Sequence, residues 1–309
     1  MSATESMSST IIKATHLSKD FGEVKAVNDL SFTVNSGQVY GFLGQNGAGK
    51  STTIRMLLTL IEPTTGEIEI FGMNLKKHRR DILRRTGAII ERPDLYKYLT
   101  ALENVRIFSR LSGVRVPDKK IIDQLAMVGL AERARSKVRT YSQGMKQRLG
   151  LACSLIHDPE LLILDEPTNG LDPQGIADMR NMIIHLSKDL GKTLLVSSHL
   201  LSEMEMVADH MLIIHKGKKI VEGRVDQLLN PLSSIVELIT PDMPATLNFL
   251  QQSHWKKFIK EGSEEAIRLE FDKTNIPQLN KELVENGFSV MSLRPVHSLE
   301  DYFLAQTKE

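Results

Sequence analysis

A glycine-rich stretch, GQNGAGKST from Gly44 to Thr52, comes directly after a short apolar run and directly before a helical pattern. Its glycines let successive backbone N–H groups turn toward one anion, and the helix that begins near Lys50 points the positive end of its dipole at the same place. The Lys50 ammonium can reach the β and γ phosphates of a nucleotide, and Ser51 offers a hydroxyl to Mg²⁺. The residues predicted to bind the nucleotide are Gly44, Gln45, Asn46, Gly47, Ala48, Gly49, Lys50, Ser51 and Thr52. A chance glycine-rich turn is the alternative, and the flanking strand and helix argue against it.

Short apolar runs alternate with longer helical patterns through the middle of the chain. Buried strands are expected at residues 39–44, 86–90, 161–165 and 193–198. Continuous apolar runs separated by helices are typical of a mainly parallel sheet that is covered on both faces. Residues 11–34 and 66–72 resemble antiparallel strands, and residues 99–150 predict a helical insert. The fold class is therefore α/β, with an antiparallel β subdomain and a helical insert on a parallel core.

A domain boundary is expected near Pro231, where the chain changes character. We expect a disordered tail at residues 1–9, a main domain at residues 10–230 and an accessory domain at residues 231–309. The accessory domain reads as strand, helix, a possible strand at 255–262, strand, helix, strand and a closing helix at 298–306, which suits a small α+β, ferredoxin-like βαββαβ unit. An irregular extension packed on the first domain is the alternative.

Two adjacent acidic residues follow a continuous apolar strand in LLILDEP. Ligands bind at the carboxyl edge of a parallel sheet, so Asp165 and Glu166 are placed beside the phosphates. We expect Asp165 to hold Mg²⁺ through a water and Glu166 to accept a proton from an attacking water. His199 follows the next apolar strand; a histidine in this position is more often structural, but the same sheet edge already carries phosphate chemistry.

Composition and charge limit the partners of the chain. Apolar residues make up 41% of the 309 residues and charged residues 25%, with a formal charge of +1, which gives no reason to invoke nucleic acid. The accessory domain is acidic, with eight Lys or Arg against twelve Asp or Glu. Cys153 has no partner for an internal disulfide and is expected to be a small core residue. No stretch approaches the roughly 20 apolar residues that span a bilayer, so any membrane function needs other chains.

With the stretch YSQGMKQRLGLA between them, these motifs make the chain resemble the nucleotide-binding subunits of ABC transporters over about residues 10–228. The resemblance implies the P-loop NTPase fold of an ABC cassette and ATP with Mg²⁺ as the bound species. It implies that Glu166 is the catalytic carboxylate and that His199 contacts the γ phosphate. It also implies that Phe21 stacks on adenine, for which a core position is the alternative. The remaining implied nucleotide contacts are Ser142, Gln143 and Gly144 of the signature segment and Asp172 of the D-loop.

The resemblance further implies a head-to-tail pair of cassettes that holds ATP between the glycine-rich loop of one copy and the signature helix of the other. ATP hydrolysis then drives separate membrane-spanning permease subunits, from the cytoplasmic face of the cell membrane. The signature variant SQGMKQR and the ending VHSLEDYFLAQT resemble drug-exporter and lantibiotic-immunity subunits. Export of an antibiotic, peptide, lipid or similar substrate is therefore expected, and the cargo stays open.

Glu91 stands where the family usually has a glutamine that reaches Mg²⁺ and the attacking water. A carboxylate binds Mg²⁺ better than an amide does, but it adds negative charge near the γ phosphate. Glu91 is therefore expected to be a catalytic and metal-binding residue, and the resemblance places Glu at this point in lantibiotic-immunity exporters. The alternative is an idle Glu91 paired with Arg92 or a surface lysine.

Two other functions are weighed against transport. One is an ABC-type ATPase that acts on ribosomes or DNA; such proteins carry two cassettes or a long coiled coil, whereas this chain has one glycine-rich loop about 90 residues before the signature. The other is a nucleotide-binding regulator without turnover, against which Glu166 and His199 argue.

Overall fold

The structure is a computed structural model, and it describes residues 9–229, 234–263 and 266–296. The chain divides into two compact units, Met1–Gly223 and Arg224–Glu309, which are described separately below. The predicted domain boundary, near residue 230, is a few residues after the division between Gly223 and Arg224. Most of the predicted disordered tail and the predicted closing helix at 298–306 lie outside the described residues.

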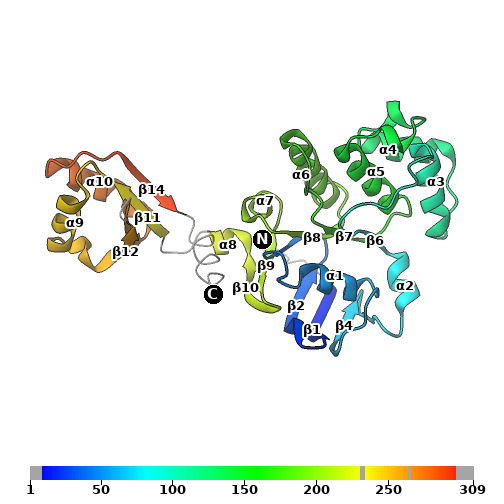
Figure 1. The fold of residues 1–309 in the computed structure, drawn as a ribbon, viewed down its shortest axis with the longest axis horizontal. Helices are drawn as coiled ribbons and strands as arrows, with labels where there is room; N and C mark the ends of the chain where they lie inside the picture. The colour runs from blue at the N-terminus through cyan, green and yellow to red at the C-terminus, as the bar shows by residue number, and fades with distance from the viewer. Residues whose placement is uncertain (1–8, 230–233, 264–265, 297–309) are drawn as a thin grey trace, which may run out of the picture. The chain divides into compact units, whose positions relative to one another are not determined.

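The first unit is built on a six-stranded sheet with the strand order β10-β9-β3-β8-β7-β6 (Figure 1). Its strands are β3 (Val39–Leu43), β6 (Thr86–Ile89), β7 (Leu161–Asp165), β8 (Thr193–Ser198), β9 (His210–His215) and β10 (Lys218–Arg224). The pairs β3–β8, β3–β9, β6–β7 and β7–β8 are parallel. Every residue of β3, β7 and β8 is buried, which explains why these strands are continuous apolar runs. The predicted parallel core is confirmed.

An antiparallel sheet packs next to this core, in the order β2-β1-β4-β5. Its strands are β1 (Thr10–Phe21), β2 (Val24–Asn35), β4 (Thr65–Ile70) and β5 (Met73–Asn74). Helix α1 (Lys50–Leu57) shares one hydrophobic cluster with both sheets, in which Ile12, Ile54 and Leu212 are fully buried. The other helices of this unit outside the insert are α2 (Arg79–Arg84), α6 (Pro173–Lys188) and α7 (Leu201–Glu205). The predicted β subdomain is therefore present, and its core holds α1 in place.

The helical insert forms a third layer with its own core. It contains α3 (Ala101–Leu111), α4 (Asp118–Met127) and α5 (Gln143–Leu155), with 3-10 turns at Ala131–Arg133 and Val138–Thr140. Thr100 and Glu103 form a reciprocal capping box that starts α3. Leu125, Leu149 and Cys153 are buried in the cluster that joins the three helices, as the sequence predicts for Cys153.

The second unit contains a four-stranded sheet in the order β12-β13-β11-β14, in which the pairs β12–β13, β13–β11 and β11–β14 are antiparallel. Its elements are α8 (Val225–Leu229), β11 (Ser234–Ile239), α9 (Met243–Gln252), β12 (Ile259–Ser263), β13 (Ala266–Phe271), α10 (Ile276–Glu285) and β14 (Ser292–Val296). After α8, the order is β-α-β-β-α-β, as predicted. The ferredoxin-like description of the unit stays a prediction.

One strand of this unit was predicted too early. Residues 255–262 alternate like a strand, but residues His254–Phe258 form a 3-10 turn and β12 begins only at Ile259. Ser253 accepts a hydrogen bond from Trp255 N, and the Trp255 side chain is buried in the core. Burial of one large ring therefore overrides the local alternation.

No helix within the described ranges is long and apolar enough to cross a membrane.

Candidate functional site

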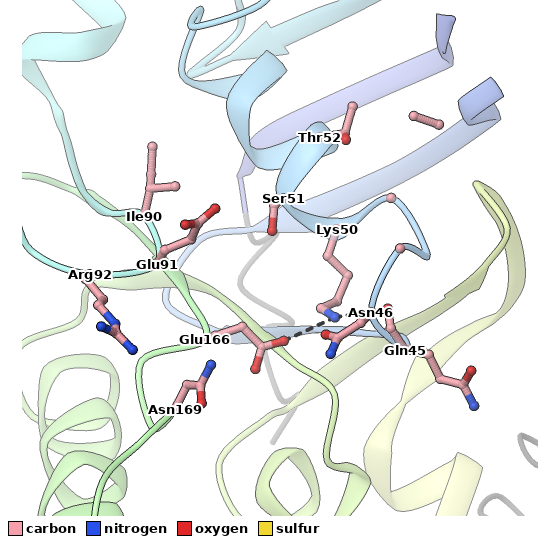
Figure 2. A pocket seen from close by; sticks show the side chains of 13 residues that line it. Gln45, Asn46, Lys50, Ser51, Thr52, Ile90, Glu91, Arg92, Glu166 and Asn169 are labelled. Carbon is pink, nitrogen blue, oxygen red and sulfur yellow. Dashed lines mark hydrogen bonds and ion pairs between the residues drawn. The ribbon is translucent and has the colours of Figure 1, made fainter. Parts of the chain in front are cut away.

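Four neighbouring strands deliver their following loops to one edge of the six-stranded sheet. Strands β3, β8, β7 and β6 lie side by side, and their parallel direction places every carboxyl end at that edge. A cavity of about 690 Å³ opens there (Figure 2). The predicted site residues that line it are Gln45, Asn46, Gly47, Gly49, Lys50, Ser51, Thr52, Glu91 and Glu166. The fold thus brings together residues that are more than a hundred positions apart in the sequence.

The glycine-rich loop leaves no room for side chains at two positions. A Cβ atom on Gly49 would lie 2.5 Å from the carbonyl oxygen of Ala26, and Gly49 has φ 107°. A Cβ atom on Gly44 would lie 2.7 Å from the carbonyl oxygen of Ile214. The loop is therefore wedged between β2 and β9, and only glycine permits this approach.

Lys50 starts α1 and is almost fully buried. Its Nζ donates to the carbonyl oxygen of Gly44 at 2.6 Å. The same Nζ lies 3.1 Å from Oε1 of Glu166 (Figure 2). A buried ammonium is stable only with such partners. The cation that the sequence assigns to phosphate binding therefore lies directly against the predicted catalytic carboxylate.

Glu166 is held in an unusual position by the end of β7. Its backbone adopts φ 49°, which a non-glycine residue rarely does, and its N–H donates to Oγ of Ser197 at 2.9 Å. Its second carboxylate oxygen, Oε2, lies 2.7 Å from Nδ1 of His199. Since its side chain is only 13% exposed, Glu166 is a mostly buried carboxylate between a cation and an imidazole.

Asp165 lies one residue earlier and is fully buried. Its Oδ1 accepts a 2.6 Å hydrogen bond from Ser197 Oγ, so one serine holds both acidic residues. Its Oδ2 is also buried but has no hydrogen-bond partner among the residues that the structure describes. This oxygen is available to a group that the chain itself does not supply.

Glu91 also follows a strand, β6, and also has a left-handed backbone, with φ 55°. Its carboxylate is 62% exposed and accepts a 2.6 Å bond from Nη2 of Arg55 on α1. The alternative, in which Glu91 pairs with Arg92 or a surface lysine, named the wrong partner, because the ion pair is with Arg55. Arg55 is separated by one helical turn from Ser51, so the pair connects the loop after β6 to the phosphate-binding helix.

Other predicted residues lie outside the lining of the cavity. Phe21, at the end of β1, is 52% exposed with Lys19 Nζ 5.1 Å from its ring centre, so the core alternative is wrong. Ser142 Oγ accepts from Met145 N and caps α5, and Asp172 Oδ1 accepts from Gly175 N and caps α6. The remaining predicted contacts outside the lining are Gly44, Ala48, Gln143, Gly144, Asp165 and His199.

The sequence reasoning missed four residues that line the cavity, namely Ala26, Ile90, Arg92 and Asn169. Ile90 and Arg92 flank Glu91, and Asn169 lies three residues after Glu166, so their nearness to predicted residues was a usable signal. Ala26 gave no signal, because it reaches the site only through the packing of β2 against the glycine-rich loop.

Comparison with known proteins places this site in a family. Residues 27–169 match the family described as "ABC transporter". Over 298 residues the chain is 46% identical to the bacitracin transport ATP-binding protein BcrA of Bacillus licheniformis, covering 96% of this chain and 97% of the relative. The chain belongs to the ATP-binding subunits of ABC transporters.

Two further relatives agree with this assignment. The lantibiotic transport ATP-binding protein SrtF of Streptococcus pyogenes is 44% identical over 216 residues, which cover 70% of this chain and 92% of SrtF. A solved ATP-binding subunit of an ABC transporter superposes with a TM-score of 0.63 and 31% identity, covering 71% of this chain and 92% of that structure.

Membership of the ABC family confirms the predicted cassette fold and the predicted class of activity. The chain is an ATPase subunit that powers transport, and it works as a dimer with separate membrane permease subunits. The alternatives of a ribosome- or DNA-acting ATPase and of a regulator without turnover are not supported, because relatives over nearly the full length are named as transport proteins.

Proposed function

We propose that Glu166 is the general base of ATP hydrolysis in this chain. The observation that carries the proposal is the position of its carboxylate, 3.1 Å from Lys50 Nζ on one side and 2.7 Å from His199 Nδ1 on the other. A base must lie within hydrogen-bond reach of the water it deprotonates, and Glu166 lines the cavity beside the glycine-rich loop. A water at the γ phosphate would therefore meet Glu166 first.

Lys50 and His199 have separate tasks in this proposal. Lys50 places a positive charge on the β and γ phosphates, where it offsets the charge that moves to the leaving group. His199 fixes the Glu166 carboxylate from the opposite side and presents its ring to the γ phosphate. The backbone N–H groups of the loop from Gly44 to Gly49, together with the start of α1, bind the remaining phosphate oxygens.

The residues present fit a magnesium ion. Asp165 Oδ2 is buried without a hydrogen-bond partner among the described residues, one position before Glu166, and Ser51 lines the cavity together with Glu166. Oxygen ligands of this kind, with water and phosphate oxygens, are what Mg²⁺ prefers. We therefore propose that Ser51 and Asp165 hold Mg²⁺, with Glu91 beside them. When bound, the ion would neutralise phosphate charge during the transfer.

The second half of the nucleotide site is proposed to come from another copy. Ser142 and Gly144 lie at the start of α5, a helix of 13 residues whose first turn contains no acidic residue. Such an N-terminus suits a phosphate, and a head-to-tail dimer would bring it to the loop of the partner. Asp172 would contribute from the D-loop, and the exposed ring of Phe21 is free to stack on adenine.

The loop after Glu91 is proposed to face the permease at the cytoplasmic side of the membrane. Tyr98 is 79% exposed and Tyr96 51% exposed, whereas Leu95 is buried in the insert. The buried Asn104 accepts from Tyr96 N and donates to the carbonyl oxygens of Tyr96 and Thr100, so this loop has a fixed shape. Exposed aromatic side chains on a rigid loop suit a docking surface.

Replacing Glu91 with Gln is expected to change how ATPase activity depends on Mg²⁺. A unit charge about 4 Å from another in water contributes about 1 kcal/mol, so the Mg²⁺ concentration for half-maximal activity should rise about fivefold. The ion pair with Arg55 is largely exposed, and its loss should change the melting temperature little. Mg²⁺ titrations of ATPase activity, with and without the permease, measure both effects.

The matched control for Glu91→Gln is Arg55→Met, which breaks the same ion pair and leaves the carboxylate in place. If Glu91 faces Mg·ATP, only Glu91→Gln shifts the Mg²⁺ dependence. Unchanged activity and unchanged permease coupling in Glu91→Gln would instead show that Glu91 is idle.

The proposed cargo is a peptide antibiotic of the bacitracin class. The support is the 46% identity to a bacitracin transport subunit over nearly the full length of both chains. Expressing the chain together with its permease subunits should raise the inhibitory concentration of bacitracin for a sensitive host about fourfold or more. Expression of Glu166→Gln with the same permease is the control and should give no protection. Protection against a lipid-like or polysaccharide-directed compound, without protection against bacitracin, would contradict the assignment.

A further inference from the structure

The carboxylate of Glu203, on the short helix α7, lies between the two loops that carry Glu166 and His199. Its Oε2 accepts a hydrogen bond from Thr168 Oγ1 at 2.7 Å and another from Ser198 Oγ at 3.1 Å. Thr168 lies two residues after Glu166, and Ser198 lies immediately before His199. One oxygen atom therefore connects the loop after β7 to the loop after β8.

On the β8 side, Ser198 holds the backbone around His199. Its hydroxyl oxygen accepts a hydrogen bond from Leu200 N at 3.0 Å, so the serine side chain connects the residues on either side of His199. Ser198 is only 1% exposed, and its single hydroxyl proton has two acceptors in reach, Glu203 Oε2 at 3.1 Å and the Leu200 carbonyl oxygen at 3.4 Å. The charged and nearer acceptor is favoured. Glu203 thus sets the orientation of the hydroxyl that shapes the His199 turn.

On the β7 side, the loop after Glu166 is held at two points. Thr168 is bound by Glu203, and the carbonyl oxygen of Pro167 accepts from Nε2 of Gln147, a buried residue of α5. The carbonyl oxygen of Glu166 itself accepts from Asn169 N at 3.1 Å. The backbone that carries Glu166 is therefore fixed between the signature helix and α7, and Glu203 is the anchor on the α7 side.

We propose that Glu203 is a positioning residue for ATP hydrolysis. By binding both loops at once, it keeps Oε2 of Glu166 2.7 Å from Nδ1 of His199. Glu203 does not line the nucleotide cavity, so it acts through the other two residues. The inference rests on the roles proposed above for Glu166 and His199. Since a displacement of about 1 Å at a reacting group can cost about a hundredfold in rate, loss of this anchor should affect turnover far more than binding.

The test compares the full-length chain with two variants of Glu203 in steady-state ATPase and nucleotide-binding assays. Glu203→Ala removes both hydrogen bonds and should lower kcat about 10- to 100-fold. ATP affinity should stay within about twofold, because Lys50 and the glycine-rich loop are untouched. Glu203→Gln keeps an acceptor oxygen and should recover most of the turnover. Glu205→Ala is the matched control, since Glu205 lies on the same helix and none of the described residues forms an ion pair or side-chain hydrogen bond with it.

Glu203 could also act only on stability, as a favourable charge in the first turn of α7. The variant Thr168→Val distinguishes that structural role from the proposed positioning role. This variant keeps the side-chain shape and leaves α7 unchanged, yet it removes one of the two connections. We expect a fall in kcat without a matching fall in ATP affinity or melting temperature. It also provides the test if Glu203→Ala does not fold.

The decisive comparison repeats Glu203→Ala in a His199→Ala background. If Glu203 acts by holding the Glu166 carboxylate against the His199 ring, its loss should cost less than about threefold once that ring is absent. An equal cost in both backgrounds, or an unchanged kcat in Glu203→Ala and Thr168→Val, would overturn the inference. Failure of the underlying proposal is distinguishable, because in that case Glu166→Gln would itself retain turnover.

Discussion

Glu166→Gln is expected to lower the turnover number for ATP by about two to four orders of magnitude while ATP stays bound. The amide keeps the size of the side chain and can still accept a hydrogen bond from His199, but it cannot take a proton from water. Lys50 loses its carboxylate partner at 3.1 Å and gains the γ phosphate when ATP binds, so affinity should be unchanged or slightly higher. Single-turnover hydrolysis and equilibrium nucleotide binding measure the two quantities separately.

Glu160→Gln is the matched control for Glu166→Gln. Glu160 precedes the same strand, β7, at the opposite edge of the sheet, and it pairs with Arg85 through two hydrogen bonds. The control makes the same chemical change to an ion-paired glutamate far from the phosphate loop and should leave kcat within about twofold. Undiminished hydrolysis in Glu166→Gln would remove Glu166 from the role of general base.

Lys50→Met should have the second large effect, a loss of ATP affinity of about a hundredfold with a still greater loss of hydrolysis. A unit-charge contact at an effective dielectric near 20 is on the order of 4 kcal/mol before desolvation, and a hundredfold change corresponds to about 2.7 kcal/mol. The variant also leaves the mostly buried Glu166 without its cation. Nucleotide binding measured by equilibrium dialysis or fluorescence gives the affinity directly.

Two further variants show how much of the lost affinity in Lys50→Met comes from the missing contact with the phosphates of ATP. Lys192→Met removes another little-exposed lysine, paired with Asp158 far from the cavity, and should lower stability without changing ATP affinity. The double variant Lys50→Met with Glu166→Gln removes both charges. If Lys50 served only to neutralise Glu166, the double variant would bind ATP normally, and that result would contradict a phosphate-binding role.

Much of the fold and of the candidate site follows from local sequence. Strands β3, β7 and β8 are continuous apolar runs because the sheet is covered on both faces, and each is followed by the polar residues that meet at one edge. The glycine-rich loop is recognisable from one segment, because its glycines have the spacing of a phosphate-binding loop and it lies between a strand and a helix. Local patterns of this kind suffice to locate Lys50, Asp165 and Glu166.

The contacts that local sequence could not provide are those between side chains distant along the chain. Arg55 pairs with Glu91 across 36 positions and Glu203 binds Thr168 across 35, and nothing in either segment signals its partner. The strand predicted at 255–262 begins only at Ile259, because a pattern of alternation takes no account of the burial of Trp255. Cap contacts explain the positions of Ser142 and Asp172 within one chain, whereas their proposed nucleotide contacts need a second copy.

ATP-dependent accumulation of labelled bacitracin in inside-out membrane vesicles would measure export powered by this chain without an intermediate readout. The vesicles would come from cells that express the chain together with its permease subunits. We expect accumulation that requires hydrolysable ATP and is abolished by Glu166→Gln, while Glu160→Gln has no effect. Equal accumulation with wild-type chain, with Glu166→Gln and without the chain would contradict it.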